Sequence, residues 1–219
     1  MARLTRLLPL LFLMSACAFV VTPPQDFSSL ISRTERSLLR LELAPVDVVN
    51  PLTGEETARR PVCTGFVIDS ARHYALTATH CVATPYLDAN GKQAHTIWFN
   101  AELDLAVIEI QQTLPALSAH FGTVSRGQQT WVLGFGYGQS RPIFRQAYVS
   151  EYEIRYGLEP DVWITLDRSF VGGLSGSPIL DTSGAVVGIA LQSDGLSGWG
   201  RPISAILRET QQFWERQLF

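Results

Sequence analysis

The chain has 219 residues, of which 46% are hydrophobic and 17% are charged, and its formal net charge is −3. This composition is globular and supplies enough apolar surface for one barrel-type domain or two small ones, which excludes an intrinsically disordered chain. The basic residues form no stripe along the sequence, so we expect no role in nucleic-acid binding.

The first eighteen residues have the pattern of a secretory signal peptide. Arg3 and Arg6 precede a nearly continuous apolar run at 7–14, and small residues follow at 15–18. A helix that crosses a bilayer needs roughly 20 apolar residues, so this run is too short to be a membrane anchor. We therefore interpret residues 1–18 as a signal peptide and expect the protein to be exported, either to the periplasm and cell envelope or into the medium.

The position of cleavage has two interpretations. The small residues Ala16 and Ala18 fit the signal-peptidase rule and would leave Phe19 as the new N-terminus. Residues 14–17 also resemble a bacterial lipobox, in which case Cys17 would carry a lipid, the only membrane contact that we expect. In either case we interpret residues 19–36 as a tether or short pro-segment and residues 37–219 as the folded domain.

After residue 36 the sequence is typical of short strands separated by turns. Turn-forming clusters such as 50–54 and 88–92 interrupt runs of β-prone residues, a pattern that predicts an all-β sandwich or barrel. Only residues 202–219 have apolar residues spaced as on one face of a helix, which we expect to pack against the barrel. The predicted strands are 37–44, 65–68, 74–77, 96–99, 105–110, 130–134, 143–152, 161–166, 178–180 and 185–191.

Two cysteines remain once Cys17 is set aside. Cys63 and Cys81 form an even pair in a chain that we expect to be exported to an oxidising compartment, which favours a disulfide. Two free buried thiols are the alternative.

The most informative segment is the run of glycine and serine at 172–177. Ser175 lies between glycines on what reads as a tight loop, and an apolar run follows at 179–180, which suits a nucleophile that leads into a buried strand. Gly173 would allow its own N–H and that of Ser175 to converge and form an oxyanion hole. The alternative is an ordinary turn rich in glycine and serine.

Two upstream residues supply the partners that such a serine needs. A serine hydroxyl is a poor nucleophile unless a base accepts its proton and a third group orients that base. His80 ends a strand-like run, and Asp104 opens the apolar run at 105–110, where a buried carboxylate must be paired. The Nδ1–H group of His80 is a natural partner for it. The alternatives are a packed or surface histidine and a turn-capping aspartate.

With these residues the chain resembles the bacterial members of the trypsin-like serine proteases, which have the chymotrypsin fold. The matching segments are 63–68, 76–81, 104–108, 173–178 and 188–190. The resemblance implies two six-stranded antiparallel β-barrels with a C-terminal helix, and the catalytic triad His80, Asp104 and Ser175 in the cleft between them. It also implies a disulfide between Cys63 and Cys81, and a serine endopeptidase that acts through an acyl-enzyme.

The same resemblance locates a substrate pocket. Counting back from the nucleophile puts Ser169 and Phe170 near the base of this pocket, and the segment Leu191-Gln192-Ser193 would pair with the substrate backbone. These positions hold no acidic residue, which argues against a preference for lysine or arginine.

One residue departs from the family pattern. Leu174 stands where the animal enzymes have aspartate and many bacterial relatives have asparagine, and we expect it to affect how the oxyanion loop forms.

The order of the three residues excludes other hydrolases. An α/β-hydrolase needs the order Ser, Asp, His, whereas all four histidines here precede Ser175. A subtilisin-like order would need an aspartate ahead of His80 in a helix-rich chain. A catalytically impaired protease-fold binding protein of the cell envelope is the remaining alternative, whereas a purely structural lipoprotein would explain Cys17 but not the three motifs.

The remaining chemistry-bearing residues suggest no further site. His73, His95 and His120 show no metal-ligand spacing, so we expect neither a metal nor a cofactor. Trp163 and Trp199 are interpreted as core or pocket wall. We expect a monomer whose partner is a protein or peptide substrate.

Overall fold

The computed structural model describes residues 27–49, 52, 54, 56–84, 86–119, 124–156 and 160–217. The expected signal peptide, Cys17 and His120 therefore lie outside the described residues. Within the described ranges, no helix has the length and hydrophobicity needed to cross a membrane.

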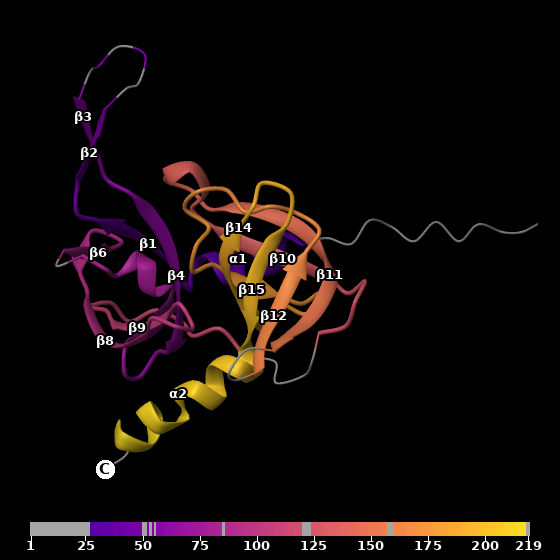
Figure 1. Ribbon diagram of the computed structural model, residues 1–219. Helices are drawn as coiled ribbons and strands as arrows, with labels where there is room; N and C mark the ends of the chain where they lie inside the picture. The colour runs from indigo at the N-terminus through magenta and orange to yellow at the C-terminus, as the bar shows by residue number, and fades with distance from the viewer. Residues whose placement is uncertain are drawn as a thin grey trace, which may run out of the picture.

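The N-terminal half is a curled antiparallel sheet of seven strands in the order β7-β6-β1-β4-β5-β9-β8 (Figure 1). Strand β1 shows why it forms: Leu39, Leu41 and Leu43 are buried while the residues between them are half-exposed, which is the period-two pattern of a strand with one buried face. Strands β7 and β8 remain as edges, so this half is an open barrel. The strands are β1 (Leu38–Leu43), β4 (Val62–Asp69), β5 (Tyr74–Thr77), β6 (Leu87–Ala89), β7 (Lys92–Gln93), β8 (His95–Asn100) and β9 (Leu105–Glu109).

The C-terminal half is a closed six-stranded barrel in the order β10-β11-β12-β15-β14-β13. Strand β13 closes it by pairing with β10, where Leu180 faces Trp131. Fully buried side chains such as Ile164, Leu166 and Ile179 fill the interior. The strands are β10 (Gln129–Gly134), β11 (Ile143–Tyr156), β12 (Pro160–Leu166), β13 (Pro178–Leu180), β14 (Val186–Ser193) and β15 (Gly198–Pro202).

The predicted all-β fold of two barrel units and a C-terminal helix is confirmed, with one difference in detail. The first unit is a curled half-barrel of seven strands, whereas six strands in a closed barrel were expected. Each of the ten predicted strands is present. The prediction missed β6, β7 and β15, as well as the hairpin of β2 (Val46–Val49) and β3 (Glu56–Arg59), which projects from the body of the molecule.

Two helices complete the fold. Helix α2 (Ile203–Gln217) lies close to the predicted range and crosses beneath both halves (Figure 1). Its Phe213 ring contacts Tyr74 and Trp98 of the first sheet, each with 6.2 Å between ring centroids. Helix α1 (Ser28–Glu35) lies inside the segment interpreted as a tether or pro-segment, and its Leu30 is buried against the core.

The disulfide between Cys63 and Cys81 is present. Cys63 lies on β4 and Cys81 ends the 3-10 turn η1 (Thr79–Cys81), with 5.9 Å between the Cα atoms and a sequence separation of 18. Since His80 precedes Cys81 directly, the bridge fixes the segment that carries this histidine to β4.

The disulfide leads to a stability prediction. Replacement of both Cys63 and Cys81 by alanine should lower the free energy of unfolding by about 3 kcal/mol, because the unfolded chain regains the entropy of the closed loop. Urea unfolding followed by circular dichroism measures this, with reduced wild-type protein as the control. A loss below about 0.5 kcal/mol in both samples would contradict the loop-entropy argument.

Candidate active site

His80 and Asp104 are in direct contact. The ring Nδ1 of His80 lies 2.7 Å from Oδ2 of Asp104, and the backbone N–H of His80 donates to Oδ1 of the same carboxylate at 3.0 Å. One carboxylate thus holds both the backbone and the ring of the histidine. With Nδ1–H donated to Asp104, the neutral ring presents Nε2 as a proton acceptor.

The turn that carries Asp104 is tied down from both halves of the molecule. Asp104 has φ of 55°, in the left-handed region that non-glycine residues adopt rarely. Its carbonyl accepts the N–H of Thr79 at 3.2 Å. From β15, the buried Arg201 donates to the carbonyl of Leu103 at 2.7 Å and to that of Glu102 at 3.3 Å. Sequence analysis missed Arg201, because nothing local marks it as a partner for residues about a hundred positions away.

Ser175 lies beside the histidine segment at the boundary between the two halves. Its carbonyl accepts the N–H of Thr64 on β4 at 2.9 Å, and Cys81 Sγ lies 3.9 Å from the same oxygen. Its hydroxyl donates to the carbonyl of Leu191 on β14 at 3.5 Å. A Cβ built on Gly176 would lie 3.2 Å from the backbone nitrogen of Ala78, which confirms that the serine loop passes against the residues ahead of His80.

The backbone around Ser175 requires glycine and leaves two amides unused. Gly173 has φ of 95°, and a Cβ on it would lie 2.3 Å from the carbonyl oxygen of Phe135. Among the hydrogen bonds of the described residues, neither the N–H of Gly173 nor that of Ser175 is a donor. An oxyanion hole needs two such unused amides beside its serine.

The loop supplies a matched pair of glycine variants. Gly173→Ala should lower the free energy of unfolding by about 2 kcal/mol or more, because alanine is strained at this φ and its methyl group meets Phe135. Gly172→Ala should change it by less than about 0.5 kcal/mol, since a Cβ at Gly172 has no atom within 4 Å. Urea unfolding of both variants measures the difference. Equal free energies of unfolding for the two variants would contradict the positive φ of Gly173 and its close approach to Phe135.

Leu174 is fully buried in the core of the closed barrel. The departure from the family pattern therefore replaces a polar side chain by an apolar anchor that fits its surroundings. The side chains of this core are Val132, Val149, Ile164, Leu166, Ile179 and Val187, among others.

The residues predicted to form the substrate pocket lie together in part. The N–H of Phe170 donates to Oγ of Ser193 at 3.1 Å, and that hydroxyl donates to the carbonyl of Ser197 at 3.1 Å. A Cβ built on Gly198 of β15 would lie 2.7 Å from the Phe170 ring, so Gly198 joins this group although sequence analysis did not single it out. The carbonyl of Ser169 accepts a hydrogen bond from the guanidinium of Arg145 at 3.1 Å.

The last two predicted pocket residues differ in exposure. Leu191 is buried, and its carbonyl accepts the hydrogen bond from the Ser175 hydroxyl, whereas Gln192 is exposed. Both lie on β14, which pairs with β15.

His73, His95, Trp163 and Trp199 lie outside the group formed by His80, Asp104 and Ser175. His73 lies 3.1 Å from the hydroxyl of Thr113, and His95 is exposed on β8. Trp163 is buried and stacks on the guanidinium of Arg201, whose Cζ lies 4.4 Å from the ring centroid, and Trp199 is half-buried against the core. His80 Nδ1 or Nε2 lies within 4.8 Å of the sulfur atoms of Cys63 and Cys81, but both sulfurs belong to the disulfide and offer no thiolate to a metal.

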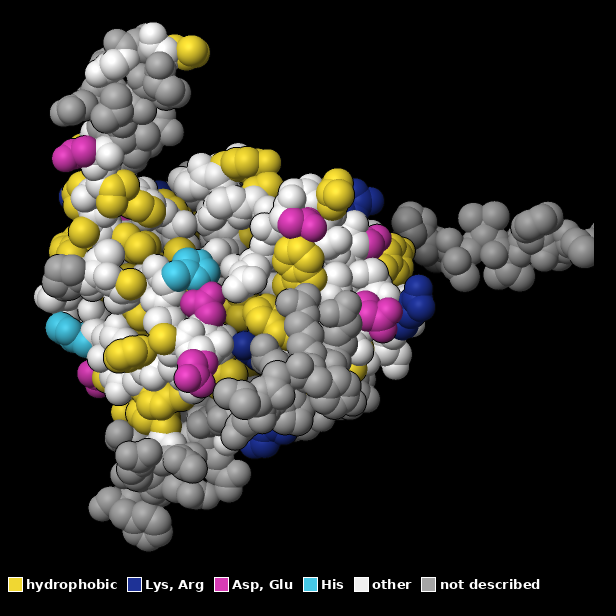
Figure 2. All heavy atoms as spheres, viewed as in Figure 1, with side chains coloured by type: hydrophobic (Ala, Val, Ile, Leu, Met, Phe, Trp, Pro, Cys, Tyr) yellow, Lys and Arg dark blue, Asp and Glu magenta, His cyan; other side chains and the backbone are white. Residues whose placement is uncertain are grey.

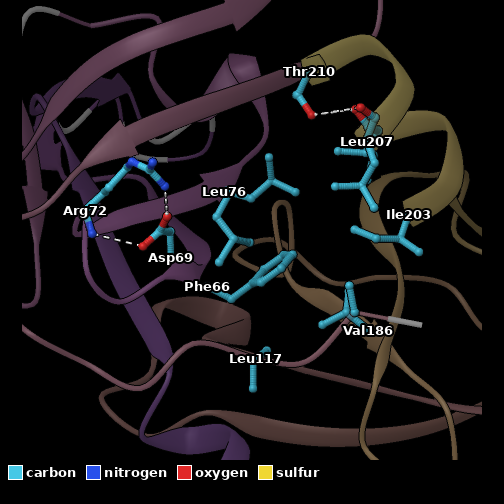
Figure 3. Close-up of a pocket in the computed structure, with 12 residues that line it drawn as sticks. Phe66, Asp69, Arg72, Leu76, Leu117, Val186, Ile203, Leu207 and Thr210 are labelled. Carbon is cyan, nitrogen blue, oxygen red and sulfur yellow. Dashed lines mark hydrogen bonds and ion pairs between the residues drawn. The ribbon is translucent and has the colours of Figure 1, made fainter. Parts of the chain in front are cut away.

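A separate hollow lies beneath α2 (Figure 3). Its volume is about 400 Å³, and its walls include Phe66, Leu117, Ile203 and Leu207, but none of His80, Asp104 and Ser175. The carboxylate of Asp69 at its rim accepts the backbone N–H of Arg72, which holds the pKa of Asp69 below its usual range. The polar groups around this hollow are therefore bonded to their own neighbours.

A half-barrel and a closed barrel with a C-terminal helix define the chymotrypsin-like fold. The turn before Asp104 and the loop of Ser175 each accept hydrogen bonds from the opposite half. A family model described as "Trypsin-like peptidase domain" matches residues 63–189, which is more than half of the chain. The chain therefore belongs to the trypsin-like peptidase family. A comparison with curated protein sequences found no significant match.

Several solved structures share this fold. An HtrA-type protease, AlgW, solved with a decapeptide, superposes with a TM-score of 0.70 at 19% identity, covering 87% of this chain and 68% of that one. A serine endoprotease from Yersinia pestis gives a TM-score of 0.69 at 18% identity, covering 87% of this chain and 67% of that one. The active form of the Rv3671c protease from M. tuberculosis gives a TM-score of 0.66 at 21% identity, covering 83% of this chain and 82% of that one.

Proposed function

We propose that the protein is a serine endopeptidase that hydrolyses peptide bonds with His80, Asp104 and Ser175 as its catalytic triad. The observation that carries this proposal is the pair of hydrogen bonds that the backbone N–H and the ring of His80 donate to the carboxylate of Asp104, with Ser175 held beside that segment. Membership of the trypsin-like peptidase family supports it.

The proposed reaction has two stages. Ser175 Oγ attacks the substrate carbonyl while Nε2 of His80 takes its proton, and the amides of Gly173 and Ser175 stabilise the oxyanion. The imidazolium, stabilised by Asp104, then gives the proton to the leaving amine. Water repeats the sequence on the acyl-enzyme and releases the second product.

The proposal extends to specificity, partners and location. Phe170, Ser193 and Gly198 would form the base and wall of the pocket for the residue before the scissile bond, and the Phe170 ring against Gly198 would favour a small side chain there. We propose a monomer that acts on proteins or peptides after export. It would be either free with Phe19 first or lipid-anchored at Cys17, which mass spectrometry of the mature N-terminus distinguishes.

A covalent probe tests the triad. Wild-type protein should be labelled by a fluorophosphonate, whereas Ser175→Ala should not be labelled, because the probe bonds to Ser175 Oγ. His80→Ala should keep Ser175 but lose its base, with kcat lower by roughly 10⁴- to 10⁶-fold. An unlabelled wild-type protein of native circular dichroism would favour the alternative, a catalytically impaired binding protein with this fold.

The pocket leads to a specificity prediction. Phe170→Ala should shift cleavage toward larger apolar residues before the scissile bond, with about tenfold or more gain in kcat/KM for phenylalanine relative to alanine, because the side chain that fills the pocket is removed. A peptide-library cleavage profile measures this, with Phe144→Ala, whose ring stacks on Trp131, as a matched aromatic control. An unchanged profile would remove Phe170 from the pocket.

A further inference from the structure

The direction of the oxyanion amides is set by the carbonyl groups of the same peptides. No cis peptide occurs in the described residues, and in a trans peptide the N–H and C=O groups point in opposite directions. A carbonyl that is held by a hydrogen bond therefore fixes where the next residue's N–H points. The amides of Gly173 and Ser175 therefore keep their direction only while the carbonyls of Gly172 and Leu174, which belong to the same peptides, are held elsewhere. The Gly173–Leu174 peptide lies between these two peptides, so its own carbonyl must be held as well.

Each of the four carbonyls from residue 172 to residue 175 has a partner. The carbonyl of Gly172 accepts the N–H of Tyr137 at 2.6 Å, and that of Leu174 accepts the N–H of Ser177 at 3.0 Å. The other two are both held by Thr64.

Thr64 reaches this loop from the first half of the molecule. Its hydroxyl donates to the carbonyl of Gly173 at 2.8 Å, and its N–H donates to the carbonyl of Ser175 at 2.9 Å. The same hydroxyl oxygen accepts the N–H of Phe135 at 2.9 Å, and the carbonyl of Thr64 accepts the buried hydroxyl of Thr77 at 2.8 Å. Thr64 itself is fully buried.

We propose that Thr64 is a positioning residue of the oxyanion hole. Its hydroxyl locks the Gly173–Leu174 peptide against Phe135, so that the neighbouring amides of Gly173 and Ser175 stay directed toward the substrate. The inference deepens the proposed function, on which it rests, because it assigns a role at the same site to a residue that would not touch substrate. Without the hydroxyl, the Gly173 carbonyl loses its donor and the Phe135 N–H loses its acceptor. The Gly173–Leu174 peptide is then held only by the bond from the Leu174 N–H to the carbonyl of Val171 at 3.1 Å.

The first test compares Thr64→Val with Thr64→Ser. Valine keeps the shape but lacks the hydroxyl, and it should lower kcat on a fluorogenic peptide that wild type cleaves by about 10- to 100-fold, with KM changed less than about threefold. Serine restores the hydroxyl and should recover kcat to within about fivefold of wild type. Thr130→Val is the matched control, since it removes an equally buried hydroxyl that donates to the Ala147 carbonyl, between β10 and β11, at 3.1 Å.

The pattern of results separates a structural loss from a positioning role. The proposal is overturned if Thr130→Val loses as much kcat as Thr64→Val does. It is also overturned if Thr64→Ser loses as much kcat as Thr64→Val does. If Thr64→Val does not fold, Thr64→Ala serves as the variant without a hydroxyl. A kcat of Thr64→Ser as low as that of Thr64→Ala then overturns the proposal.

A second measurement does not depend on activity. In ¹H–¹⁵N spectra, the amide signals of Gly173 and Ser175 should shift or broaden in Thr64→Val and stay in position in Thr130→Val. Unchanged signals overturn the proposal even for an active enzyme. The two proposals can fail separately. If the signals shift in Thr64→Val but a fluorophosphonate does not label the wild-type protein, the positioning role stands and the proposed function fails.

Discussion

The candidate site depends on hydrogen bonds that cross the boundary between the half-barrel and the closed barrel in both directions. From the first half, the backbone and the hydroxyl of Thr64 hold two carbonyls of the Ser175 loop. From the second half, Arg201 holds the carbonyls that precede Asp104. A shift of one half against the other would therefore disturb the serine and the aspartate together. The geometry of the site is thus a property of the packed pair, and neither half contains it alone.

Unusual backbone conformations gather at this boundary. Gly173, Gly176 and Asp104 all have positive φ values, and two of them are glycines that approach other backbone atoms closely. Asp104 adopts this conformation with a side chain, which short polar residues do at the least cost. Its carboxylate is fully committed to His80. The strain is offset because neighbouring residues in both halves hold these turns, and the result is a rigid arrangement of donors and acceptors.

The sequence predicted best where a strand was apolar and bounded by turn residues. Strands such as β5, β9 and β14 follow this rule, as does the amphipathic helix α2. The prediction missed β3, β7 and β15, whose residues are polar or glycine-rich and are held in place by their neighbours' register. It also missed β2 and β6, which have only four and three residues. Helix α1 was missed because its short run of polar residues becomes stable only when Leu30 is buried.

What the sequence determined by itself is the set of chemical groups and their order: the pair His80 and Asp104, the glycine-flanked Ser175, and the two cysteines that bridge. These are local signals, since a turn, a buried strand or a glycine run is encoded within a few residues. Only the tertiary structure decided that Thr64 and Arg201 hold the site. Their partners lie 109 and 98 residues away along the chain, and such contacts depend on strand register and on how the halves pack. No local pattern carries that information, because it arises only when the sheet curls and the barrel closes.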